Sequence, residues 1–264
     1  QRIIRDSVLD LLQGVMSPEK IRELDRAGEF PFEAYRALAD AGWMSLPFSE
    51  EVGGSGGSHK DLAVLVEAMA YHYASMATAY LTTVIYAGQH IALHGSEHLK
   101  STYLPGIMDG SIRMAIALTE PGAGSDLASL QCRAISDGDD YIINGSKTWT
   151  TDAHNANRMF CLVRTNTDGK PQAGITFLLL EMDTPGIAVE PIHILGGDHE
   201  FNQVFFDDVR VPKANRVGEE NKGWTVAKYL LEFERGGVAY SPQAVSYTHL
   251  RAHETVLDLV CRLL

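Results

Sequence analysis

The chain has 264 residues, of which 45% are hydrophobic and 21% charged, a composition typical of a globular protein with one or two domains and a sizeable core. Its formal net charge of −12 argues against a protein that holds nucleic acid or anionic lipid by electrostatic attraction. No apolar run approaches the ~20 residues of a membrane-spanning helix, so no membrane span is expected.

The first part of the chain, residues 3–110, has apolar residues at spacings of three and four, which predicts an all-helical region. Pro31 suits the first turn of a helix, and Gly42 can supply the left-handed residue that ends it. Two long, mostly apolar helices are expected at residues 61–73 and 75–93. Such helices are suited to burial in a bundle.

From residue 112 to about residue 211 the pattern changes to short β-type runs separated by turns. Strands and helices do not alternate there and no GxGxxG motif is present, so a Rossmann fold is not expected. We predict an antiparallel β-domain, barrel-like or sandwich-like, with strands at residues 112–118, 141–143, 160–165, 175–180 and 203–206.

A last amphipathic helix is predicted at residues 221–240. Its apolar stripe consists of Trp224, Ala227, Leu230, Leu231 and Phe233. No partner helices follow it in the sequence, so the stripe is expected to face water.

The β-type run that begins at Met114 ends in a glycine-dense turn, and the whole segment reads MAIALTEPGAGSDLAS. Thr119 and Ser125 carry hydroxyls that can donate and accept hydrogen bonds. Gly122 and Gly124 lack a Cβ, so the backbone amides there can approach a planar or anionic ligand closely. These features indicate a ligand-binding loop.

A second motif, KTWTTD at residues 147–152, places the indole of Trp149 beside the hydroxyls of Thr150 and Thr151. Either motif alone is compatible with an ordinary turn or strand. In this order, however, the two motifs closely resemble the acyl-CoA dehydrogenase flavoproteins.

The resemblance implies a FAD-dependent dehydrogenation beside a thioester. Such a reaction needs a base for the α-proton, a hydride acceptor facing the β-carbon and donors that polarise the carbonyl. No side chain accepts a hydride, so a redox cofactor is required. By position in the family pattern, Leu118 and Thr119 line the pyrimidine side of the flavin, and Trp149 packs beside the ring. Thr151 corresponds to the residue that bonds near the flavin N5.

The resemblance also implies where the substrate lies. Gly124 and Ser125 belong to the flavin loop, and Ser125 matches the position that contacts the acyl-CoA near its pantetheine. In most of the family the catalytic base comes from a C-terminal helical bundle, but one branch uses a Glu immediately before an Arg, the place that Glu234 occupies before Arg235. The alternative is that this pair forms a solvated helix face, with Arg235 either at the substrate site or structural.

The sequence also contains a cluster of acidic and histidine residues, for which no metal site is predicted. The turn GGDHEFNQ brings Asp198, His199 and Glu200 together, but these crowded ligands precede a strand, and the family has a similar turn without a metal. His90, His94 and His98 are spaced by four residues and would share one face of a continuous helix. Ser96 is predicted to begin a new helix, so His98 is not expected to lie on the same face as the other two.

The resemblance covers residues 3–243 and implies a multidomain α+β protein. The expected parts are an N-terminal helical domain at 1–112, a middle β-domain at 113–217, the first helix of an incomplete C-terminal helical domain at 218–245, and a non-family tail at 246–264. The tail is interpreted as a possible artefact. We expect the family's C-terminal domain, which pairs subunits and completes the FAD site, to be missing.

The resulting hypothesis is a cytoplasmic, homodimeric or homotetrameric acyl-CoA dehydrogenase. It would form a trans-2-enoyl-CoA and pass electrons from FAD to an electron-transfer flavoprotein, with the acyl pocket shaped by helices around residues 71–86. The three cysteines, Cys132, Cys161 and Cys261, are too few and scattered for a disulfide framework or a zinc site and fit a reducing cytoplasm. The alternatives are a catalytically incomplete binding remnant, or an acyl-CoA oxidase or flavin monooxygenase on the same fold.

Overall fold

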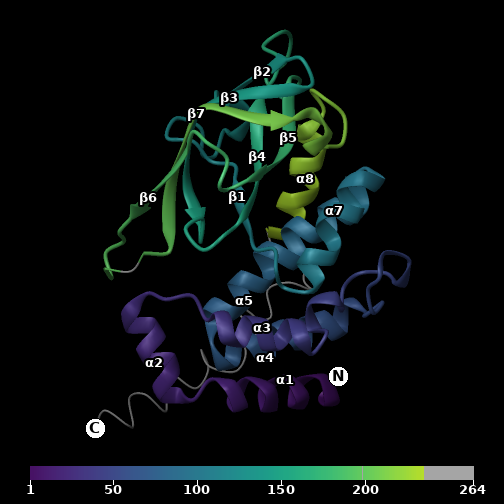
Figure 1. Ribbon diagram of the computed structural model, residues 1–264, viewed down its shortest axis with the longest axis vertical. Helices are drawn as coiled ribbons and strands as arrows, with labels where there is room; N and C mark the ends of the chain where they lie inside the picture. Colours follow the sequence, from purple (N-terminus) through teal and green to yellow (C-terminus); the bar gives the residue numbers. More distant parts are fainter. Residues whose placement is uncertain (198, 235–264) are drawn as a thin grey trace.

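The N-terminal region is helical, as predicted. The computed structural model describes residues 1–197 and 199–234, and most of the N-terminal helices lie in the lower half of the molecule in Figure 1. The α-helices are α1 (Arg2–Val15), α2 (Pro18–Ala27), α3 (Phe32–Asp40), α4 (His59–His72), α5 (Ala74–Tyr80), α6 (Gln89–His94) and α7 (Glu97–Met108). Between them lie the 3₁₀ turns η1 (Trp43–Ser45) and η2 (Glu50–Val52) and the π-helical segment η3 (Leu81–Gly88).

Local signals set the ends of these helices. Pro31 stands at the N-cap of α3, and Gly42 has the left-handed φ of 80° expected after its end. Ser58 and Asp61 form a capping box at the start of α4, in which each side chain bonds the backbone of the other. Ser96 caps α7 by accepting a hydrogen bond from the Leu99 N–H at 3.3 Å. The predicted helix at 75–93 is found as the continuous run α5–η3–α6.

The middle of the chain forms one eight-stranded sheet, which lies above the helices in Figure 1. Its strands are β1 (Met114–Ala117), β2 (Arg133–Asp137), β3 (Asp140–Thr151), β4 (Arg158–Arg164), β5 (Ile175–Glu181), β6 (Ile187–Ile192), β7 (Phe201–Pro212) and β8 (Arg216–Val217). The predicted runs fall on β1, β3, β4, β5 and β7, whereas β2, β6 and β8 were not predicted.

The strand order is β6-β7-β3-β2-β4-β5-β8, with β1 added beside β4. Most neighbours are antiparallel, as predicted, but β1 and β2 each pair with β4 in parallel. The α+β fold class with a mainly antiparallel β-domain is therefore confirmed, and the two parallel pairs were not predicted. β1 pairs with residues 158–161 of β4 and β2 with Arg164, so the two strands follow one another in the same direction along β4, with the glycine turn between them.

The sheet separates two hydrophobic cores. Side chains of alternate residues in β4, such as Phe160 and Leu162, join the core shared with the helices. Their neighbours Met159, Cys161 and Val163 join a second core with residues of β3, β5 and β7. Because strands from both ends of the sheet contribute to that second core, the sheet curls around it.

Helix α8 (Gly223–Glu234) packs on β5, α6 and η3, and the prediction that its apolar stripe faces water is wrong. Ala227 and Leu230 are fully buried, and Trp224 and Leu231 are partly buried against the shared core. The apolar stripe of α8 is covered by elements that precede the helix in the chain, whereas the prediction considered only helices that would follow it. The Phe233 side chain and residues 235–240 of the predicted helix lie outside the described residues.

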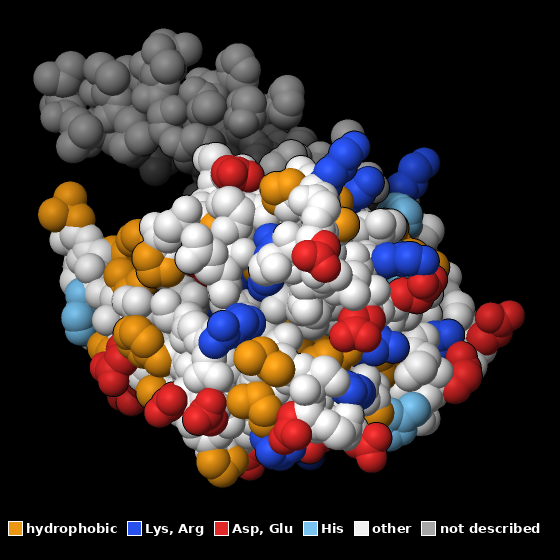
Figure 2. All heavy atoms as spheres, turned by 90° about the horizontal axis from the view of Figure 1, so that it is seen from above, with side chains coloured by type: hydrophobic (Ala, Val, Ile, Leu, Met, Phe, Trp, Pro, Cys, Tyr) orange, Lys and Arg blue, Asp and Glu red, His pale blue; other side chains and the backbone are white. Residues whose placement is uncertain are grey.

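Acidic and basic side chains are interspersed on the face shown in Figure 2. In the β-domain, Arg210 pairs with both Asp137 and Asp140, at 2.8 and 3.0 Å. Within the described part of the chain, none of the helices combines the length and the apolar character that crossing a membrane requires.

Candidate flavin and acyl-CoA site

The glycine turn follows β1 and is closed by its own backbone. Glu120 N–H donates to the Ala123 carbonyl at 3.1 Å, and Ala123 N–H donates back to the Glu120 carbonyl at 3.0 Å. Gly122, Gly124 and Ser125 are exposed at the far end of the turn. A Cβ added at either glycine would meet no atom within 4 Å, so the space beside these amides is open to a ligand.

The second motif lies directly beside this turn. The Thr148 N–H in β3 donates to the carbonyl of Thr119 at 2.9 Å, which joins the two sequence motifs at their centres. Leu118 is 9% exposed and Thr119 is half-buried, so both lie at the base of the turn.

Trp149 has an unusual backbone. Its φ is 59°, a left-handed value that bulky residues rarely adopt, and its side chain is 55% exposed. A shift in the pairing of β3 with β7 between Lys147 and Thr150 produces this conformation, and Phe201 holds the indole by an edge contact at 5.8 Å. Strain of this kind costs on the order of 1–3 kcal/mol and clusters at functional sites.

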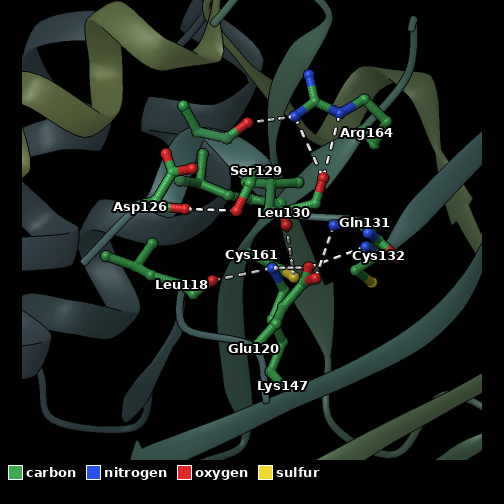
Figure 3. A network of polar contacts seen from close by, with 12 residues as sticks. Leu118, Glu120, Asp126, Ser129, Leu130, Gln131, Cys132, Lys147, Cys161 and Arg164 are labelled. Carbon is green, nitrogen blue, oxygen red and sulfur yellow. Dashed lines mark hydrogen bonds and ion pairs between the residues drawn. The ribbon is translucent and has the colours of Figure 1, made fainter. Parts of the chain in front are cut away.

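A buried ion pair that the sequence analysis did not identify supports both motifs (Figure 3). The Lys147 ammonium, which is 0% exposed, donates to Glu120 Oε1 at 2.8 Å and to the Leu118 carbonyl at 3.0 Å. Glu120 also accepts hydrogen bonds from the N–H groups of Gln131 and Cys132, at 2.6 and 2.8 Å. In the sequence, this ion pair is visible only as a glutamate in the glycine-turn motif and a lysine in the KTWTTD motif.

The return from the turn is held by Arg164 (Figure 3). Its guanidinium donates to the carbonyls of Ala128 and Leu130, at 2.6 and 3.2 Å. The Ser129 hydroxyl donates to the Asp126 carbonyl at 2.7 Å. The turn is thus fixed at both ends while its glycines stay exposed.

A cavity of about 240 Å³ adjoins the residue after Thr151. Asp152 and His154 line it from the sheet, and Tyr73, Ser75 and Thr78 line it from the helical region. Burial raises the pKa of the Asp152 carboxyl above its ordinary value. Residues of the 24–31 segment, such as Leu24 and Phe30, also line it, so the cavity adjoins only one end of the region around residues 71–86 where the acyl pocket is expected.

His199 stacks on His154, with ring centroids 3.9 Å apart, and bonds Asn202. Burial lowers the pKa of His154, and the neighbouring His199 lowers it further. Asp198 lies outside the described residues, within which no group of three acidic, histidine or cysteine side chains is arranged to hold a metal.

The Thr148–Thr119 hydrogen bond brings Leu118 and Thr119 beside the Trp149–Thr151 segment, whereas Gly124 and Ser125 lie exposed farther along the same turn. It does not place the predicted base. The backbone of Glu234 ends α8, but its side chain and the whole of Arg235 lie outside the described residues.

The structure thus combines a helical domain with a curled β-domain, in which a glycine turn is joined to a tryptophan-bearing strand. Two domain models identify the family: residues 1–111 match the acyl-CoA dehydrogenase N-terminal domain, and residues 115–209 match the acyl-CoA dehydrogenase middle domain. The chain belongs to the acyl-CoA dehydrogenase family.

Individual relatives agree with this assignment. The probable acyl-CoA dehydrogenase YngJ of Bacillus subtilis is 34% identical over 90% of this chain and 63% of its own length. The caffeyl-CoA reductase-Etf complex subunit CarC of Acetobacterium woodii is 31% identical over 90% of this chain and 63% of its length. The crystal structure of acyl-CoA dehydrogenase from Geobacillus kaustophilus matches with a TM-score of 0.82 and 30% identity, over 89% of this chain and 62% of that one. The chain thus spans less than two thirds of each relative.

Proposed function

We propose that the protein to which this chain belongs is a FAD-dependent acyl-CoA dehydrogenase, which converts an acyl-CoA thioester into a trans-2-enoyl-CoA. The observation that carries the proposal is the Thr148–Thr119 hydrogen bond, which sets the exposed Trp149 beside the open glycine turn. Two motifs that would each be weak evidence alone form one surface.

The residues of this surface fit a flat ring with a phosphate-bearing tail. The open space at Gly122 and Gly124 admits a ligand close to the backbone amides, and the indole of Trp149 offers an apolar face. In our proposal Leu118 and Thr119 line the pyrimidine side, Gly124 belongs to the flavin-binding loop, and Thr151 bonds near N5. FAD, when bound, supplies the hydride acceptor that no side chain provides.

The remaining residues act on the acyl-CoA. Ser125, exposed beside the turn, would bond the pantetheine, and Arg235 would contribute to the substrate site. Glu234 would remove the α-proton while the hydride leaves the β-carbon. Electrons would then pass to an electron-transfer flavoprotein, a role supported by the likeness to a subunit of an Etf complex. We propose a cytoplasmic homo-oligomer for the whole protein.

Anaerobic flavin reduction by a panel of acyl-CoA thioesters tests the proposal. It is measured with the 264-residue chain and with an extended chain, in which residues after 243 are replaced by the corresponding part of the Bacillus subtilis relative. Reduction of the flavin by at least one acyl-CoA is expected in at least one of these two chains. FAD binding without reduction by any of them would favour the catalytically incomplete remnant, and peroxide release in air would favour an oxidase.

The base is tested by Glu234→Gln in the same two chains. Loss of a positioned base lowers the rate of reduction by about 10² to 10⁴. Glu232→Gln, two residues away on the same helix, is the matched control. Equal rates for both variants would show that another residue removes the proton.

A further inference from the structure

The Lys147–Glu120 pair is buried at the point where the two motifs meet. The side chains are 0% and 8% exposed, and their charged atoms are 2.8 Å apart. Removing two charges from water costs several kcal/mol for each ion, and a buried pair regains this only through good geometry and additional hydrogen bonds. A pair of this kind therefore has to be explained by what it holds in place.

Glu120 closes the base of the glycine turn. Glu120 is the first residue of the turn. Its two carboxylate oxygens accept hydrogen bonds from the N–H groups of Gln131 and Cys132, where the chain re-enters the sheet. The intervening residues, with Gly124 and Ser125 among them, form a loop whose two ends meet at one carboxylate.

Lys147 fixes this closed loop relative to the second motif. It lies two residues before Trp149 and donates both to Glu120 and to the Leu118 carbonyl. The next residue, Thr148, bonds the Thr119 carbonyl through its backbone. Consecutive residues of β3 thus hold consecutive carbonyls of the turn.

We propose that Lys147 and Glu120 are positioning residues for the proposed flavin site. They fix the separation between the glycine turn and the Trp149–Thr151 segment, so that both can contact one flavin. The inference rests on the proposed function, because it gives the pair a role in FAD binding in addition to its role in folding.

The test separates FAD affinity from stability. The double variant Glu120→Gln with Lys147→Met replaces the pair by neutral side chains of similar size, which avoids an unpaired buried charge. The control, Leu65→Ala, removes a fully buried side chain of α4 and leaves the pair intact. Each variant is made in the 264-residue chain and in the extended chain, and FAD binding is measured at a temperature at which each is folded.

The double variant is expected to keep a melting temperature near that of the unaltered protein but to bind FAD about 10- to 100-fold more weakly, a loss of the size typical when residues that orient a binding group are changed. The visible absorption band of any bound flavin is expected to shift. Leu65→Ala is expected to show the reverse, a lower melting temperature with unchanged affinity and an unchanged band. Affinity that follows stability across the variants would overturn the proposal.

Two further outcomes are also decisive. If the unaltered chain binds no FAD in either form, the proposed function fails and the positioning role fails with it. If the double variant does not fold, Lys147→Gln replaces it, because its amide ends one bond short of the ammonium position. Unchanged FAD affinity and an unchanged band in folded Lys147→Gln would overturn the positioning role while leaving the proposed function intact.

Discussion

The polar contacts at the start of α4, in the helical region, and those at the candidate site, in the β-domain, differ in range. At the start of α4 the polar contacts join near neighbours, as in the capping box of Ser58 with Asp61. At the candidate site they join distant segments, as in the pair of Lys147 with Glu120. A local contact stabilises one helix end, whereas a long-range contact also determines where two segments of the site lie. The same kind of substitution is therefore expected to have different consequences in the two regions.

The largest effect is expected from Lys147→Met, which breaks the long-range pair and leaves a buried carboxylate without its counter-ion. The free energy of unfolding is expected to fall by about 3–5 kcal/mol, measured by urea denaturation. The matched control is Lys213→Met. Lys213 also donates to a backbone carbonyl of the β-domain, that of Gly138, but it is only half-buried, so a smaller loss of about 1 kcal/mol is expected. Equal losses for the two variants would contradict the special role of the buried pair.

The next effect concerns the helical core. Leu65→Ala removes a fully buried side chain from α4 and is expected to cost about 2–5 kcal/mol, depending on how far the cavity closes. Leu93, in α6, is 57% exposed, so Leu93→Ala is expected to change little. Urea denaturation followed by circular dichroism measures both. A small loss for Leu65→Ala would mean that the helical core repacks readily and would weaken the comparison.

The same difference in range explains what could be predicted from the sequence. The starts of α3 and α7 were predictable because Pro31 and Ser96 act on residues within one turn of themselves. Strand β8, of two residues, and β6, none of whose residues is buried, carry too little apolar pattern to be recognised. Their existence depends on pairing with β5 and β7, which the sequence does not display.

The candidate site was predicted as two motifs but not as one structure. Resemblance identified Thr119 and Trp149, but nothing near Lys147 in the sequence indicates that this lysine is buried, because its partner Glu120 lies 27 residues away. The prediction that the apolar stripe of α8 is exposed was wrong for the same reason. Leu230 is buried by elements that precede it in the chain and not by sequence neighbours.

The junction between the two regions is expected to be sensitive to pH. His90 of α6 is buried near Phe160 and Tyr229, and burial lowers its pKa to about 4. The unfolded chain binds a proton at this histidine near pH 6.5 and the folded chain does not until about pH 4, so stability falls as the pH falls through this range.

Between pH 7 and pH 5, His90 is expected to lower the free energy of unfolding by about 2 kcal/mol, because each pKa unit corresponds to about 1.4 kcal/mol. Urea denaturation at the two pH values measures it, and His90→Phe is expected to remove that share of the loss. His98→Phe, at an exposed position of α7, is the control. If both variants lose as much stability as the unaltered chain, the pH dependence arises elsewhere.

The smallest effect is expected at the capping box. Ser58→Ala removes the acceptor for the Asp61 N–H and is expected to cost about 1 kcal/mol, or about 2–4 °C in melting temperature. Ser101→Ala, at an exposed position inside α7, is the control. Because the cap acts within one turn of α4, FAD affinity is expected to stay unchanged in both variants. A loss of affinity on Ser58→Ala, comparable with that of the Lys147 variants, would show that the helical region also sets the geometry of the site, and the division between local and long-range contacts would then fail.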